Sequence, residues 1–115
     1  MDRKKELKRQ YLQMKPIMGV FTISNIVTGE VYLEATKDLK SRMNSTPFKL
    51  NTGSHPSRPL QRQWREYGED NFKMEVLDTL EYDKDEEKRD YSDDLEVLRT
   101  IWEERLVRDG KLMMK

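Results

Sequence analysis

The sequence predicts an α+β domain in which a small three-stranded antiparallel sheet is flanked by helices. Two short stretches with apolar residues at alternating positions stand on either side of a turn at 27–30, and a third follows at 72–80. Segments with helical spacing lie before, between and after these stretches. The 115 residues fit one domain, which we expect to span 1–115 with its core at 18–109.

The first half of the chain gives three local signals. Residues 1–15 carry apolar side chains at helical spacing and predict an extra N-terminal helix. Residues 18–25 and 31–35 alternate across the turn and predict the two strands of a hairpin. Asp38 suits the N-cap of the helix that follows, and Pro47 is expected to interrupt that helix.

The second half adds a helix, a strand and a last helix. Residues 60–67 predict a short helix and residues 72–80 the third strand. Asp93 with Glu96 predicts a capping box at the start of the last helix. The tail at 112–114 is expected to be a frayed or packed apolar end. The inward stripe of the last helix is predicted to consist of Leu95, Leu98, Ile101, Trp102, Arg105 and Leu106.

Composition narrows the class of protein. The absence of cysteine excludes disulfides and a cysteine-based zinc site and suits the cytoplasm, where we expect the protein to reside. There is no apolar run long enough for a membrane span and no signal peptide, so no membrane association is expected.

The charges are unevenly distributed along the chain. Residues 1–67 hold 13 Lys+Arg against 6 Asp+Glu, and residues 68–115 hold 9 against 16, which gives net charges of +7 and −7. Such polarity can orient a charged partner, although pairing of basic and acidic segments on one surface is the favoured explanation.

Several short motifs follow one another in a familiar order. Gly19-Val20-Phe21 lies on the first strand, Tyr32-Leu33-Glu34 on the second, and Arg42 comes ten residues after Tyr32. The run Gly53-Ser54-His55-Pro56 follows. In this order and spacing, over residues 18–106, the chain resembles the GIY-YIG nucleases of bacterial and phage type, found in homing endonucleases and in an excinuclease subunit.

The resemblance implies a phosphodiester-cleaving site, of which two positions are retained. In that family two hairpin tyrosines and a histidine handle proton transfer and positioning, an arginine stabilises the phosphate, and a glutamate on the last helix holds a divalent metal. Tyr32 matches the second tyrosine and Arg42 the arginine, so these two are the candidate catalytic residues. A guanidinium can grip a phosphate through two bonds.

Three other family positions have changed. Phe21 stands at the first tyrosine and has no hydroxyl. Glu34 replaces a glycine and adds a negative charge near the expected phosphate. Thr46 stands at the usual histidine and cannot act as a general base near neutral pH.

The metal position is the sharpest departure. The family glutamate falls on Arg99, three residues before Trp102, and a cation there repels Mg²⁺. Glu96 and Glu103 lie on nearly the same helix face and would reach a metal only if the register were shifted by a turn. The sequence therefore predicts no metal cofactor.

These observations favour a catalytically impaired GIY-YIG-like domain with weak nucleic-acid binding or a regulatory role. The candidate nucleic-acid contacts are Lys37, Lys40, Arg42 and His55, although a single loop histidine such as His55 is more often a turn or packing residue. One alternative is an active endonuclease that uses Mg²⁺ or Mn²⁺ and rewired ligands, Glu34 or Glu96. Another is a protein-interaction module. The expected partners are accordingly DNA, bound weakly, or another protein.

Overall fold

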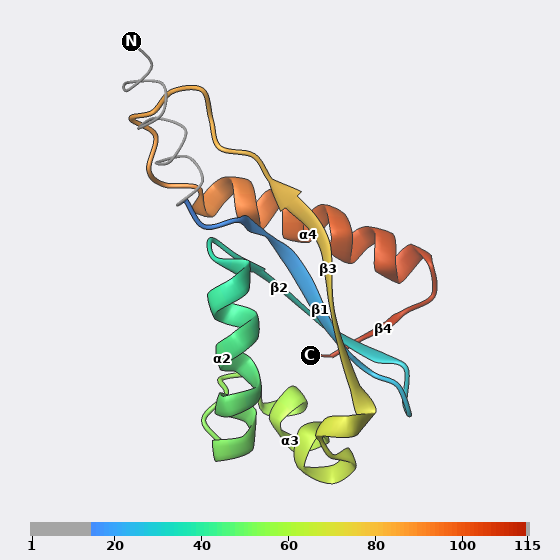
Figure 1. The fold of residues 1–115 in the computed structure, drawn as a ribbon. Helices are drawn as coiled ribbons and strands as arrows, with labels where there is room; N and C mark the ends of the chain where they lie inside the picture. The colour runs from blue at the N-terminus through green and yellow to red at the C-terminus, as the bar shows by residue number, and fades with distance from the viewer. Residues whose placement is uncertain (1–14, 115) are drawn as a thin grey trace.

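The computed structural model describes residues 15–114 and confirms the α+β class. The predicted N-terminal helix, residues 1–15, lies outside the described residues apart from Lys15. Figure 1 shows a narrow sheet with helices packed on it. The elements are β1 (Met18–Asn25), β2 (Glu30–Thr36), α2 (Leu39–Thr52), α3 (Arg58–Tyr67), the 3₁₀ turn η1 (Glu69–Asn71), β3 (Phe72–Leu80), α4 (Ser92–Arg108) and β4 (Leu112–Met113).

The sheet has four strands in the order β3-β1-β2-β4 and is mixed, which corrects the prediction of three antiparallel strands. β1 pairs antiparallel with β2 and with β3, as predicted. β4 pairs parallel with β2 through Glu30 opposite Leu112 and Val31 opposite Met113. Gly110, at φ +86°, turns the chain back after α4, so the tail reaches the free edge of β2. Two residues are too few to show alternation, so no pattern in the sequence indicates this strand.

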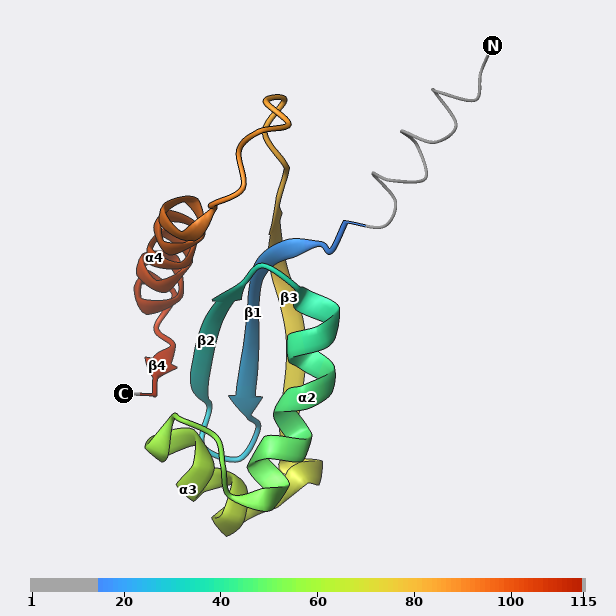
Figure 2. The same ribbon diagram turned by 90° about the vertical axis from the view of Figure 1, so that its left-hand side faces the viewer.

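The sheet lies between two helical layers, seen on its opposite sides in Figure 2. On one side the hairpin residues Phe21 and Ile23 pack with α2 and α3, in a cluster completed by Leu39, Leu50, Leu60 and Trp64. On the other side Leu95 of α4 and Tyr91, the residue just before that helix, pack with Met18. Because side chains alternate along a strand, β2 directs Tyr32 and Glu34 towards the α2 side, where they stand opposite Ile23 and Phe21.

Helix α2 continues through Pro47, so the predicted interruption is wrong. Asp38 is the N-cap, as predicted, and its carboxylate accepts the N–H of Ser41 at 3.1 Å. Gly53 ends the helix at φ +79°. A proline inside a helix costs roughly 3 kcal/mol, and we attribute its tolerance here to sound caps at both ends and to the burial of Leu39 and Leu50.

Helix α4 departs from the predicted cap and stripe. It begins at Ser92 with no side-chain cap, so the capping box of Asp93 and Glu96 is wrong. Instead, the Asp90 carboxylate accepts the N–H of Ser92 at 2.9 Å. Of the predicted stripe Leu95 is buried, whereas Ile101 is 46% exposed and Arg105 is exposed, because the narrow sheet cannot cover the whole face of a 17-residue helix. Within the part of the chain that the structure describes, no helix has both the length and the apolar character that a membrane span requires.

A buried polar network joins the hairpin turn to α3. Asn25 is fully buried, donates to the Gln63 side chain at 3.0 Å and accepts the N–H of Val27 at 2.9 Å. Gln63 in turn donates to Glu30 at 2.9 Å. Buried polar groups need such partners, and these hold α3 against the hairpin, close to the face that carries Tyr32.

Candidate functional site

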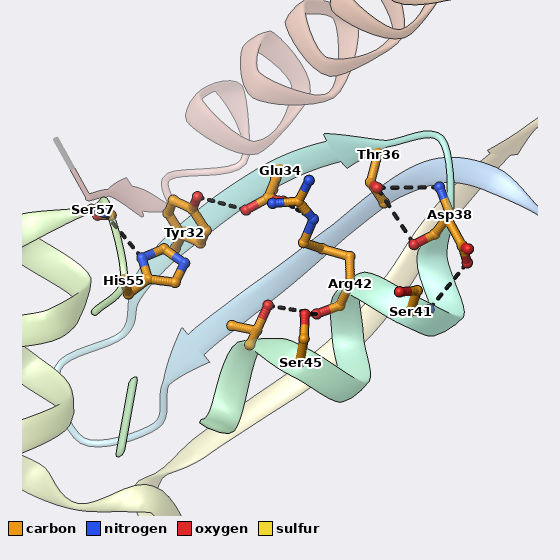
Figure 3. A network of polar contacts seen from close by, with 10 residues as sticks. Tyr32, Glu34, Thr36, Asp38, Ser41, Arg42, Ser45, His55 and Ser57 are labelled. Atoms are coloured by element: carbon orange, nitrogen blue, oxygen red, sulfur yellow. Dashed lines mark hydrogen bonds and ion pairs between the residues drawn. The ribbon is translucent and has the colours of Figure 1, made fainter. Parts of the chain in front are cut away.

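Three side chains from β2 and α2 form one polar cluster, drawn in Figure 3. The Tyr32 hydroxyl donates to Glu34 Oε1 at 2.7 Å. Glu34 Oε2 lies 3.3 Å from Arg42 Nε. The two β2 residues share a face because they are two positions apart, and Arg42 reaches them from the first turns of α2. The structure therefore brings together the two residues predicted as catalytic, with Glu34 between them.

His55 joins this cluster from the loop between α2 and α3. Its ring packs edge-on against Tyr32, with ring centroids 5.5 Å apart and planes at 84°. Its Nδ1 accepts the backbone N–H of Ser57 at 3.0 Å, and the residue is buried. A neutral imidazole that accepts through Nδ1 carries its proton on Nε2, so His55 can donate from there. His55 is both a turn residue, as favoured from the sequence, and a neighbour of Tyr32.

Burial sets the protonation of both rings. Burial raises the pKa of Tyr32, and the hydrogen bond to Glu34 and its negative charge raise it further, against an opposing effect of Arg42. Burial lowers the pKa of His55. At neutral pH the cluster thus holds a protonated phenol, a neutral imidazole and a carboxylate paired with a guanidinium.

The lowered pKa of His55 predicts a loss of stability in mild acid. Because the unfolded chain binds the proton more readily than the folded one, the contribution of His55 is complete above its ordinary pKa of 6.5 and declines as the pH falls through the folded value. Urea unfolding at several pH values between neutral and mildly acidic should show this decline. It should be smaller in His55→Asn, whose amide oxygen can still accept the Ser57 N–H. If the free energy of unfolding depended equally on pH in the two proteins, the acid sensitivity would not come from His55.

Two of the positions that differ from the family pattern, Phe21 and Thr46, are buried beside the cluster. Phe21 is fully buried in the core. Thr46 is also buried, and its hydroxyl donates to the Arg42 backbone carbonyl at 2.6 Å. Neither side chain can exchange a proton with a substrate, which leaves Tyr32, Glu34, Arg42 and His55 as the groups available for chemistry.

The expected metal position does not fit a metal. Arg99 donates to Glu96 at 2.7 Å and to Glu103 at 3.1 Å, so both carboxylates that a shifted register would offer are paired with a cation. Among residues 15–114, no three acidic or histidine side chains converge as a metal site requires. No hydrogen bond or ion pair between described residues links Arg99 to the Tyr32 cluster.

The predicted basic contacts are dispersed. Lys40 lies exposed in the first turn of α2. Lys37, also exposed, lines a separate hollow of ≈ 240 Å³ beside Tyr82 and Tyr91. Their contact with nucleic acid stays a prediction. The structure adds a basic feature that was not predicted from the sequence, a second hollow beside His55 lined by Arg58, Arg62 and Arg65. The signal for it was their spacing of four and three residues along one helix.

Comparison with solved structures defines the class of fold. The chain has the GIY-YIG nuclease fold, seen in two solved forms of one nuclease catalytic domain. The first is the catalytic domain of the homing endonuclease I-TevI, with a TM-score of 0.66, 22% identity, and coverage of 85% of this chain and 98% of that one. The second is a mutant of the same intron endonuclease domain, with a TM-score of 0.65, 24% identity, and coverage of 84% and 90%. No family model matches the sequence, and no curated protein does.

Proposed function

We propose that this protein is a nuclease-like domain that binds nucleic acid weakly, without cutting it, in an accessory or regulatory role in the cytoplasm. The observation that carries the proposal is the position of Glu34. It accepts the Tyr32 hydroxyl and pairs with Arg42, the two groups that would otherwise meet a phosphate. Tyr32 and Arg42 are therefore already bound to the Glu34 carboxylate, which takes the place that a phosphate would need.

The other changes support the same conclusion. Hydrolysis needs an activated water, charge neutralisation at the phosphate and help for the leaving oxygen. Phe21 supplies no hydroxyl at the position that the resemblance gives to the first tyrosine, and Arg99 stands at the position that it gives to the metal-binding acid. The two carboxylates beside Arg99 are paired with it. His55 can donate a hydrogen bond from Nε2, which suits binding of a phosphate oxygen more than proton abstraction.

DNA is the proposed partner. The two structural neighbours are homing and intron endonuclease domains, and the fold similarity covers 84–85% of this chain. A fold does not determine an activity, so DNA rests on this analogy together with the cationic and hydrogen-bonding groups of the cluster.

A plasmid-nicking assay tests the absence of cleavage. Supercoiled DNA incubated with the purified protein in Mg²⁺, and separately in Mn²⁺, should stay supercoiled to the same extent as with Arg42→Ala. Nicking by the wild-type protein that Arg42→Ala abolishes would instead establish an active endonuclease with rewired ligands. Binding is then measured separately, by mobility shift over a range of salt concentrations. A dissociation constant that does not respond to salt would contradict phosphate contacts.

A further inference from the structure

The outer face of α3 carries three arginines in a row. Arg58, Arg62 and Arg65 are spaced by four and three residues, which places them on one side of a helix whose other side buries Leu60 and Trp64. From the first arginine to the last the row is about 10 Å long, at 1.5 Å per residue. It is therefore a linear array of guanidinium groups on a rigid element.

These arginines line a hollow of ≈ 710 Å³ between α3 and the end of α2. His55 and Gln61 line it too, so the hollow adjoins the Tyr32 cluster through the His55 ring. Arg65 reaches across to α2, where its Nη2 lies 2.3 Å from the point that a Cβ on Gly53 would occupy. The negative end of the helix dipole at Gly53 favours a cation in that place.

The chain around this hollow carries an excess of positive charge. From Leu39 to Arg65 the sequence holds six Lys and Arg residues and neither Asp nor Glu. Among the residues that the structure describes, none forms an ion pair with Arg58, Arg62 or Arg65, in contrast to Arg42 and Arg99. Glu66 supplies the negative charge among the lining residues. Three unpaired guanidinium groups beside one carboxylate leave a surplus that an anion can neutralise.

We propose that this hollow is a binding site for the phosphodiester backbone of nucleic acid and supplies most of the domain's affinity for it. Guanidinium forks match phosphate oxygens through paired hydrogen bonds, and a row about 10 Å long can contact successive phosphates of one strand. His55 connects the row to Tyr32, so a strand held on α3 leads to the candidate site. This inference rests on the proposed function, because it assigns the residues by which the nucleic acid is held.

Fluorescence anisotropy with a labelled DNA duplex and with the corresponding single strand, over a range of salt concentrations, tests the site. The test variant replaces Arg58, Arg62 and Arg65 by alanine. The matched control replaces Lys84, Arg89 and Arg108, which are exposed and remote in sequence, and changes the net charge equally. Each lost phosphate contact lowers the slope of log K against log salt by about 0.9 on a duplex and about 0.7 on a single strand, so the test variant should lose about 2 to 3 units. We expect at least a tenfold loss of affinity, with the control close to wild type.

The outcomes separate this inference from the proposed function. If the wild-type protein binds DNA and the test variant keeps its slope, the site is wrong and the proposed function stands. If the wild-type protein binds neither duplex nor single strand, the proposed function fails, and the site with it. If a polyglutamate chain of matched charge competes as strongly as DNA, the hollow recognises acidic polypeptide, which overturns the assignment. Circular dichroism of both triple variants confirms that they are folded.

Discussion

Replacing Phe21 by alanine should lower the free energy of unfolding by about 3–5 kcal/mol. Phe21 is fully buried at the centre of the sheet and belongs to the cluster that includes Leu39 and Trp64. Truncation removes the buried ring and leaves a cavity that the surrounding side chains fill only in part. Because small domains are stable by only about 5–15 kcal/mol, a large part of the folded population should be lost.

Urea unfolding followed by circular dichroism measures this effect. Phe48→Ala is the matched control, since Phe48 on α2 is 70% exposed and its truncation should change the stability by less than about 0.5 kcal/mol. Equal stabilities for the two variants would show that Phe21 does not pack as described. The expected contrast also bears on function, because the position that the sequence resemblance assigns to a catalytic hydroxyl carries the largest fully buried side chain among the described residues.

The parts of the fold that the sequence predicts correctly are those with local signals. The alternation of β1 and β2 and the turn between them gave the hairpin, and Asp38 gave the start of α2. The predictions were wrong or missing where contacts between residues far apart in the sequence determine the structure. β4 exists because β2 offers a free edge, and Pro47 is tolerated because the caps and buried leucines hold α2 around it. The bond between Asn25 and Gln63 spans 38 residues and has no local signature.

Gly19 illustrates a position whose reason only the structure supplies. The motif likeness drew attention to it, but the backbone of β3 explains it. A Cβ at this position would lie 2.1 Å from the Asp78 carbonyl oxygen, so any side chain would push the two strands apart. The glycine is therefore explained by strand packing, with no reference to a substrate.

The residues of the candidate site could be named from the sequence, but the hydrogen bond and the ion pair that join them could not be predicted. The family resemblance named Tyr32 and Arg42 as the candidate catalytic residues, and the structure places them around one carboxylate. Glu34 was expected to repel a phosphate, but its bonds to both neighbours depend on side-chain geometry that spacing does not reveal. On α4 the sequence placed Glu96 and Glu103 on the helix face of Arg99 as possible metal ligands, whereas the structure pairs both with Arg99.

Replacing Glu34 by glutamine should strengthen nucleic-acid binding by about 10- to 100-fold. The Glu34 side chain is only 16% exposed, so its charge is poorly screened. A like charge about 4 Å away costs about 1 kcal/mol in water and about 4 kcal/mol near a protein surface, and an intermediate cost corresponds to this range of affinities. Glutamine keeps an oxygen that can accept the Tyr32 hydroxyl, while Arg42 loses its anionic partner and becomes free to bind a phosphate.

Anisotropy with the same labelled duplex measures this gain. Glu75→Gln is the matched control, because it removes the same charge from β3, where Glu75 is exposed and pairs with Lys73. A general effect of net charge would strengthen binding equally in both variants, whereas the internal anion proposed here requires the gain to be specific to Glu34. The gain should also disappear when Arg42→Ala is added, since the guanidinium released by the substitution is the group that meets the phosphate. A gain that survives in the double variant would show that Glu34 acts by another route, and no gain at all would mean that the cluster does not face the bound strand.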